Sequence, residues 1–188
     1  YYRLKDRVLS IPGVTGFARG GSWVLSGRGE PTCCVITMID RPRPPEGQRF
    51  FSAPSLVSPG FFQTLGVQLL EGRTFDDSEV EETDPNDSSL GPMPRVINAA
   101  MARKFWPDES AVGKIFFGGD HDPAVLAGSL GAGQPSGESG MLRGSRVIGV
   151  VADIHSSLEI EPAPVYFRPG PGGPTVYIRA SSDVAGMA

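Results

Sequence analysis

The chain has 188 residues and a mass of 19.9 kDa, enough to bury a core as one domain or as two small lobes. Its formal net charge of −4 at pH 7 argues against a nucleic-acid partner, because a phosphate backbone is normally met by clustered Lys and Arg. No stretch approaches the roughly 20 apolar residues that cross a bilayer, and 25 glycines with 18 prolines predict many turns and long loops.

The first part of the chain is predicted to form one short helix and several strands. Residues 1–9 place apolar side chains at helical spacing among charged ones, which indicates an amphipathic helix that ends at the following Pro-Gly. Residues 14–25, 32–39 and 50–57 are rich in β-branched and aromatic side chains, and we expect a strand in each.

Cys33 and Cys34 are adjacent and are the two cysteines of the sequence. A disulfide between neighbours is strained, so we expect two reduced thiols, mostly buried on a strand. Two cysteines also exclude a disulfide framework and a tetrahedral cysteine zinc site.

A second helix is predicted after Ser58, a candidate N-cap that precedes Pro59 at the first helical position. This helix carries Phe61 and Leu65 on a face that we expect to be buried, and Gly66 is expected to end it in the left-handed conformation. The acidic residues that follow, within 76–87, lack the spacing of a calcium loop and predict a solvated loop without a metal.

The second half of the chain is predicted to add another helix, an insertion and further strands. Asn98 is a candidate N-cap for a helix with Met101 and Phe105 on its inward face, ending before Pro107. Residues 118–144 are rich in Gly, Ser, Asp and Pro, which predicts a mobile or surface insertion that adds little to the core. We expect strands at residues 96–97, 113–117, 146–154, 164–169 and 175–180.

Two glycine-rich segments resemble nucleotide-binding loops but lack the required chemistry. Residues 129–134 faintly resemble the signature loop of ABC ATPases, and residues 133–139 faintly resemble a phosphate loop. A phosphate loop needs a Lys directly before its Ser or Thr, whereas Glu138 precedes Ser139 and repels phosphate. We therefore predict neither ATP binding nor ATP hydrolysis.

Neither of the two histidines is assigned a catalytic role. His121 has Asp120 and Asp122 beside it, and His155 follows Asp153 by two residues, so a hydrolytic metal site or a hydrolase that uses His155 is conceivable. Solvent-exposed polar residues are the favoured interpretation, because metal ligands need rigid supports. The glycines show no nucleophile turn of the G-x-S-x-G type. The sequence thus predicts no catalytic, cofactor-binding or metal residues, no cofactor, and a protein that is not an enzyme.

Three blocks of sequence carry a family resemblance. Residues 57–75 read V-S-P-G-F-F-Q-T-L-G-V-Q-L-L-E-G-R-T-F, residues 96–107 read V-I-N-A-A-M-A-R-K-F-W-P, and residues 147–154 read V-I-G-V-V-A-D-I. In this order they resemble the periplasmic core domain of MacB-type ABC transporter permeases, also described as MacB/FtsX-like, and within it the duplicated orphan permeases of soil bacteria. The resemblance runs from Tyr1 to about Ala180, with residues 118–144 outside it.

The resemblance implies an α+β, two-lobed extracytoplasmic domain. A βαβ-like porter lobe is expected to comprise residues 1–57 and 145–180, and an inserted Sabre-like lobe residues 58–144, including the flexible insert 118–144. The family has a strand before the first helix, and without that strand the sheet to which it belongs is expected to have an unfilled edge.

The resemblance also implies a non-catalytic coupler. In such proteins the external domain transmits ATP-driven motion of membrane helices to an external substrate or partner. The expected partners are flanking transmembrane helices of the same chain, an ABC ATPase subunit or domain, and an unknown periplasmic partner or substrate, but no nucleic acid. The expected location is the cell inner membrane, with this domain in the periplasm or extracellular space. The alternative is a stand-alone periplasmic ligand-binding module with a pocket between its lobes.

Overall fold

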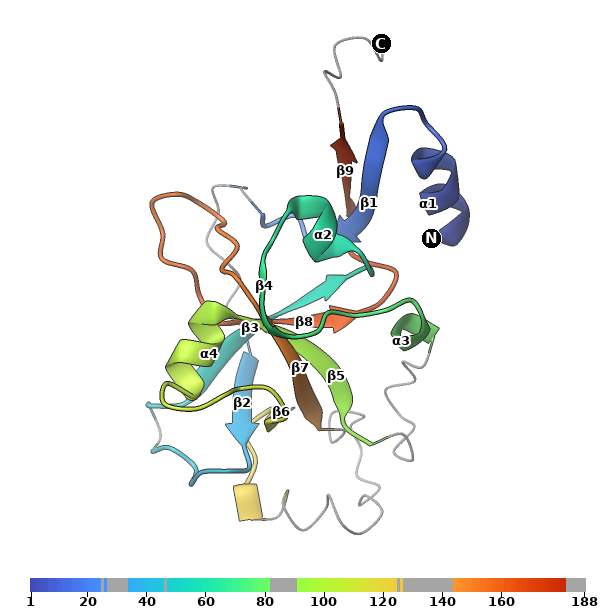
Figure 1. Cartoon of the computed structure of the whole chain (residues 1–188). Helices are drawn as coiled ribbons and strands as arrows, with labels where there is room; N and C mark the ends of the chain where they lie inside the picture. The colour runs from blue at the N-terminus through green and yellow to red at the C-terminus, as the bar shows by residue number, and fades with distance from the viewer. Residues whose placement is uncertain are drawn as a thin grey trace.

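The computed structural model describes residues 1–24, 26, 34–45, 47–81, 91–124, 126 and 144–181. Within these residues the chain is an α+β protein with more strand than helix (Figure 1). The helices are α1 (Tyr2–Leu9), α2 (Phe61–Leu65), α3 (Ser78–Glu81) and α4 (Ala99–Phe105). The strands are β1 (Val14–Gly20), β2 (Cys34–Met38), β3 (Phe50–Val57), β4 (Leu69–Gly72), β5 (Met93–Asn98), β6 (Ile115–Gly118), β7 (Ser145–Val151), β8 (Val165–Pro169) and β9 (Thr175–Ala180).

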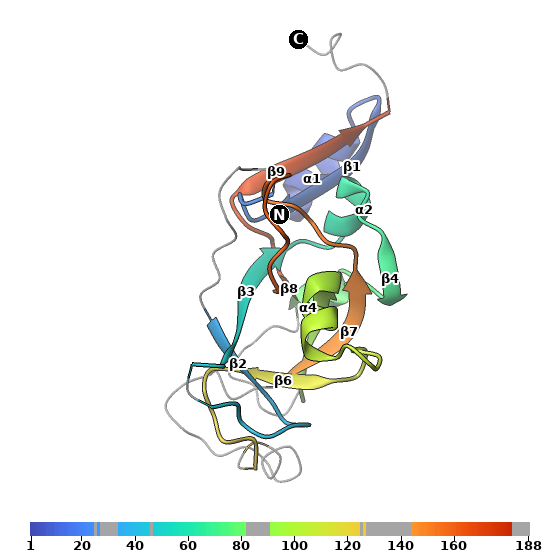
Figure 2. The same ribbon diagram turned by 90° about the vertical axis from the view of Figure 1, so that its left-hand side faces the viewer.

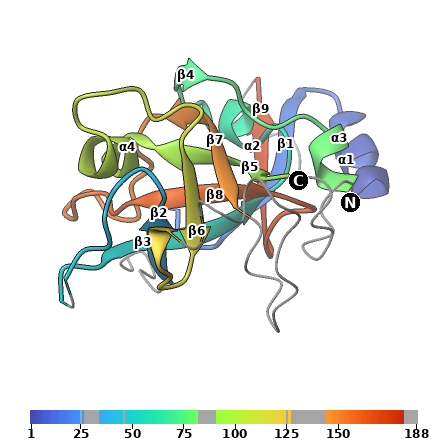
Figure 3. The ribbon, with the colours of Figure 1, turned by 90° about the horizontal axis from the view of Figure 1, so that it is seen from below.

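Seven strands form one sheet in the order β4-β7-β5-β8-β3-β2-β6. Because β6 pairs with β7 as well as with β2, the six strands other than β4 close into a ring, which we call the closed sheet (Figure 3). β7 pairs along one edge with the parallel strand β5. Along its other edge β7 pairs first with β6, near Ser145, and then with β4, near Val151.

Two backbones approach each other closely at the point where β4 replaces β6 as the partner of β7. The Arg73 amide donates to the Ile148 carbonyl at 3.0 Å, and Gly72 has a left-handed φ of +71°. A Cβ atom added at Gly149 would overlap the Arg73 carbonyl oxygen, and one added at Gly72 would overlap the Ile148 carbonyl oxygen. Neither position therefore admits a side chain unless the backbone moves.

The strands β1 and β9 form a separate antiparallel pair, which carries α1 on one face. We call residues 1–20 and 175–181, which contain α1, β1 and β9, the small unit. Figures 1 and 2 show the small unit at one end of the molecule, with α2 between it and the closed sheet. The Phe61 ring of α2 lies 5.5 Å from the Tyr177 ring of β9 and 6.3 Å from the Phe167 ring of β8. One aromatic side chain thus packs against both sheets.

Two hydrophobic clusters form the core, and the helix faces expected from the sequence point into them. Phe61, Met101 and Phe105 are fully buried, as predicted, whereas Leu65 is partly buried at the rim of its cluster. The first cluster brings together residues of β1, β3, β5, α2, β7 and β8, and the second joins residues of β2, β5, α4, β6, β7 and β8. Strand β7 contributes to both clusters.

Asn98 connects α4 to the start of β8. Its Oδ1 accepts the Met101 amide at 3.0 Å, which confirms the predicted N-cap, and also accepts the Val165 amide at 3.0 Å. Its Nδ2 donates to the Ala163 carbonyl at 2.8 Å. Because Asn98 is only 1% exposed, these bonds form in a water-poor site where an unmade bond is costly.

The predicted N-cap at Ser58 is wrong. The N-cap of α2 is Gly60, with a left-handed φ of +80°, and it makes no side-chain capping bond. Ser58 instead bonds to β1: its Oγ accepts the Arg19 amide at 2.8 Å, and its own amide donates to the Arg19 carbonyl at 2.9 Å. The end of α2 at Gly66, with φ of +71°, is as predicted.

Two other expectations from the sequence need correction. Cys34 is disulfide-bonded, so the expected reduced thiol at this position is wrong, while Cys33 lies outside the described residues. Leu126, within the expected insertion, is 2% exposed but belongs to neither hydrophobic cluster, and the expectation that the insertion adds little to the core stays a prediction. Strand β4 was not expected, because its four residues are all exposed and show no alternation of apolar and polar side chains.

The sheets do not divide at residues 57/58 and 144/145, where the lobe boundaries were expected. β2, from the expected porter lobe, pairs with β6 from the expected inserted lobe, and β7 pairs with β4, β5 and β6 across the second boundary. This grouping depends on hydrogen bonds between strands that are distant in the sequence, and such pairings cannot be predicted from the order of elements along the chain. A two-lobed organisation of the whole domain stays a prediction.

Replacing Phe105 by Ala is expected to lower the free energy of unfolding by about 3–5 kcal/mol, as removal of large buried aromatic groups does. The Phe105 ring is fully buried and makes edge-to-face contacts with the rings of Phe50, at 5.1 Å, and Trp106, at 6.0 Å. Urea unfolding measures the loss. Leu158→Ala serves as the control, since Leu158 is 88% exposed and its change should stay within about 0.5 kcal/mol. A loss below about 1 kcal/mol for Phe105→Ala contradicts the packing.

Gly149→Ala is expected to destabilise the protein by about 1–3 kcal/mol, because the new methyl group overlaps the Arg73 backbone. Gly118→Ala is the matched control: Gly118 also lies in a strand, and an added Cβ there meets nothing within 4 Å. Thermal and urea unfolding of the two variants should therefore separate them clearly. Equal stability of both would show that β4 does not lie against β7 at this point.

Candidate interaction groove

The residues around His121 make structural contacts. The ring Nε2 of His121 lies 2.9 Å from a backbone carbonyl oxygen three residues earlier. The Asp120 carboxylate accepts from Arg43 at 2.7 Å and pairs with Arg49 at 2.9 Å, and the bond from Arg43 is the main cause that lowers the pKa of Asp120. Asp122 accepts a backbone amide two residues later in the chain. These carboxylates are held by arginines and backbone rather than directed at a shared site.

Asp153 holds the N-terminus of α4. Its Oδ1 accepts the Ala100 amide at 2.7 Å, and its Oδ2 accepts from the Arg103 guanidinium at 2.8 Å. A carboxylate at this end of a helix is favoured by the exposed amides there. His155 is exposed and is not among the hydrogen-bond partners of Asp153. The structure therefore does not join the two residues that the hydrolase alternative requires.

No metal cluster is present in the described part of the chain, where no group of three or more His, Cys, Asp or Glu could hold an ion. The residues of the two nucleotide-loop likenesses, including Glu138 and Ser139, lie outside the described residues.

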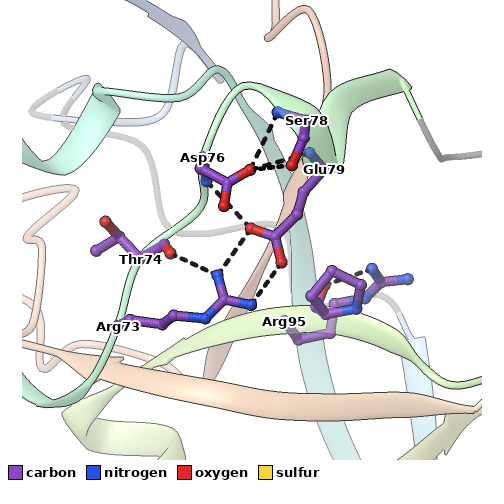
Figure 4. A network of polar contacts seen from close by, with 7 residues as sticks. Arg73, Thr74, Asp76, Ser78, Glu79 and Arg95 are labelled. Atoms are coloured by element: carbon purple, nitrogen blue, oxygen red, sulfur yellow. Dashed lines mark hydrogen bonds and ion pairs between the residues drawn. The ribbon is translucent and has the colours of Figure 1, made fainter.

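The acidic segment after β4 begins with an ordered turn that the sequence interpretation missed (Figure 4). Asp76 Oδ1 accepts the Ser78 and Glu79 amides at 3.0 and 3.3 Å, and Glu79 Oε2 accepts the Asp76 amide at 3.1 Å. This reciprocal arrangement is a capping box at the start of α3. The signal was present in the sequence, since an Asp three residues before a Glu is the pattern of such a box.

Arg73 closes this turn from the other side. Its guanidinium makes two bonds to Glu79, at 2.9 and 2.8 Å, which raise the pKa of Arg73, and a third to the Thr74 carbonyl at 3.1 Å. The Ser78 hydroxyl donates to Asp76, and this bond is the main cause that lowers the pKa of Asp76. These bonds fix the turn beside the small unit. Asp77, which follows Asp76, accepts from Lys5 of α1.

A groove of about 550 Å³ lies between the small unit and this turn. Its lining residues on the small unit are Lys5, Leu9, Thr15, Gly16, Phe17 and Arg179, and those opposite are Pro59, Gly60, Gln63, Thr64, Phe75, Asp76 and Asp77. Lys5 Nζ reaches across to Asp77 Oδ2 at 3.2 Å. The lining of the groove combines apolar side chains, such as Phe17 and Phe75, with charged side chains of both signs, a mixture that is also found at protein–protein interfaces.

Exposed apolar side chains gather on the small unit. They come from α1, the turn after it and β9: Tyr2, Leu4, Leu9, Ile11, Val176 and Ile178, each at least 39% exposed. On β9, Val176 and Ile178 lie on the face opposite Tyr177, whose ring packs against α2. Such a concentration marks a surface suited to contact with another polypeptide. The sequence did not show which of its apolar residues are exposed, because their burial depends on how α1, β1, β9 and α2 pack together.

Within the described residues, no helix has the length and apolar character needed to cross a membrane. No family model and no curated protein matches the sequence.

Solved structures do match the fold. The periplasmic region of MacB from Actinobacillus actinomycetemcomitans superimposes with a TM-score of 0.54 at 14% identity, over 99% of this chain and 67% of that one. The extracellular domain of the noncanonic ABC-type transporter YknZ from Gram-positive bacteria gives 0.49 at 15% identity, over 94% of this chain and 71% of that one. This chain thus spans about two thirds of the length of these domains.

The match to MacB covers nearly the whole chain, including the closed sheet, the small unit and the segments that carry the three sequence blocks. At this low identity the match bears on the fold and not on residues or activity. The resemblance inferred from the sequence is confirmed at that level, and this chain has the fold of the periplasmic region of MacB.

Proposed function

We propose that this chain is the extracytoplasmic domain of an ABC transporter permease and that it couples ATP-driven motion of membrane helices to an external substrate or partner. The observation that carries the proposal is the MacB-like fold over 99% of the chain. In this proposal the domain has no chemistry of its own. It lies outside the inner membrane, is joined to flanking membrane helices of the same protein, and depends on a separate ABC ATPase.

The surface of the small unit supports a mechanical function. Six exposed apolar side chains and the groove lie on one end of the molecule, whereas the carboxylates near both histidines are engaged in structural bonds. A coupler needs a surface that holds a partner and a rigid body that moves it. The closed sheet, with its buried aromatic core, supplies such a body.

Coupling can be tested in the full-length permease, reconstituted in lipid with its ATPase and with its native cysteines replaced by Ser. A spin label at Leu158→Cys, an exposed position, should report a distance to spin-labelled lipid headgroups that changes when ATP is added. The same label in the isolated chain should not respond to ATP. An unchanged distance in the full-length protein during ATP turnover contradicts the coupling function.

The isolated chain is expected neither to bind nor to hydrolyse ATP, because Glu138 stands where a phosphate loop needs its Lys. Titration calorimetry with ATP should give the heat of dilution alone, and phosphate release should not exceed that of a boiled control. Micromolar binding that disappears in Gly133→Ala or Ser139→Ala would overturn this prediction and return an enzymatic function to consideration.

A stand-alone ligand-binding module is the second candidate, and the groove of about 550 Å³ favours it. The complete reading frame separates the two candidates. Apolar spans of roughly 20 residues encoded on both sides of this chain support the permease, whereas a secretory signal before it and a stop codon soon after it support the binding module.

A further inference from the structure

We propose that the small unit is a hinged flap over the groove, which pivots where its two connections to the closed sheet cross and is held shut by the ion pair between Lys5 and Asp77. This inference goes beyond the proposed coupling function, because it concerns motion within the chain alone.

The described residues at which the small unit joins the closed sheet include several glycines and touch each other. β1 ends at Gly20 and is followed by Gly21, and β8 reaches β9 through a segment that contains Gly170, Gly172 and Gly173. A Cβ atom added at Gly173 would overlap the Gly20 carbonyl, and Gly172 has a left-handed φ of +83°. The backbones therefore cross in direct contact, and glycine on both sides allows changes of φ and ψ at low steric cost.

The pivot point is defined by hydrogen bonds beside this crossing. Arg19 and Ser58 exchange two bonds, of 2.8 and 2.9 Å, that join the end of β1 to the end of β3. These bonds hold one end of β1 against the closed sheet. The other end of β1, together with α1, lies at the groove.

The β1 part of the surface between the small unit and α2 is suited to sliding, whereas the β9 part holds Tyr177 against the Phe61 ring. The face of β1 that meets α2 consists of Gly16, Ala18 and Gly20, none of which carries more than a methyl group. Across from it, Thr64 lies against Gly16, and the Phe61 ring lies against Gly20. Smooth surfaces of this kind permit small shear movements without the unlocking of interdigitated side chains.

Weak contacts close the groove at its open side. The Lys5 and Asp77 side chains are 23% and 54% exposed and pair at 3.2 Å, and the Tyr1 hydroxyl donates to the Pro59 carbonyl at 3.4 Å. Exposed ion pairs contribute little stability and are screened by salt. Loss of the ion pair therefore favours opening of the flap, which also breaks the bond from Arg179 to the Gln63 carbonyl at 3.2 Å, whereas the Arg19–Ser58 bonds at the pivot remain intact.

Spin-label distances in the isolated chain test this device, with both native cysteines replaced by Ser. Labels at Arg7→Cys in α1 and Asp108→Cys after α4 occupy exposed positions on the two sides of the hinge. Asp77→Lys replaces the ion pair by repulsion and should raise the ratio of long to short distances about two- to five-fold, the range expected for loss of an exposed pair. About 1 M salt should shift the ratio of the unsubstituted chain in the same direction.

The charge swap Lys5→Glu with Asp77→Lys should restore the short distance. This result would show that the ion pair itself, and not a general effect of substitution, holds the flap shut. Glu109→Gln is the matched control, because it removes another exposed ion pair, with Lys114 at 2.7 Å, that lies away from the groove. Circular dichroism checks that each variant is folded, and Asp77→Asn provides a milder second variant. One narrow distance that is the same in all variants and at all salt concentrations overturns the hinged flap. If Asp77→Lys opens the flap and the charge swap does not close it again, the ion pair between Lys5 and Asp77 is not what holds the flap shut.

Discussion

The pairing of strand β7 with three other strands is the constraint on which the rest of the fold depends. Its parallel partner β5 leads directly into α4, while β6 closes the ring and β4 continues the same edge. The change from β6 to β4 requires Gly149, because no side chain fits between β7 and the Arg73 backbone. Arg73 then begins the turn that carries Asp77, so the position of the groove's outer wall follows from a contact inside the sheet.

A second consequence concerns how the small unit is joined to this sheet. The Phe61 ring packs against both β8 and β9, and beside it the chain crosses itself through glycines. The joint is thus aromatic at its centre, whereas on the side of β1 it is formed by Gly16, Ala18 and Gly20. Tyr1, the N-cap of α1, and Lys5 lie one helical turn apart, so the bond to the Pro59 carbonyl and the ion pair with Asp77 are neighbours on the same helix.

The candidate site could be predicted from the sequence only in its local parts. The capping box of α3 is present as an Asp followed three residues later by a Glu, and the N-cap at Asn98 was recognised from its place before an apolar helix face. The groove itself combines side chains from residues 5 to 179. Nothing in the local pattern of Lys5 indicates Asp77 as its partner, since 72 positions separate them and the contact arises from the folding of α1 onto β1. Ser58 illustrates the same limit, because a good local N-cap residue is used instead to bind β1.

The sequence by itself determined the class of the fold, most of the faces of α2 and α4 that are buried, the C-terminal end of α2, both ends of α4 and the likeness to the MacB periplasmic region. These features depend on periodicity, capping residues and glycine conformation, which are local properties of the chain. The tertiary structure alone decided that six strands close into a ring, that pairing crosses the expected lobe boundaries, and that Leu126 is buried while Leu65 is only partly so. It also decided where the groove and the glycine crossing lie. The physical reason is that strand partners and side-chain burial are set by contacts between distant segments, whose free energy no single segment contains.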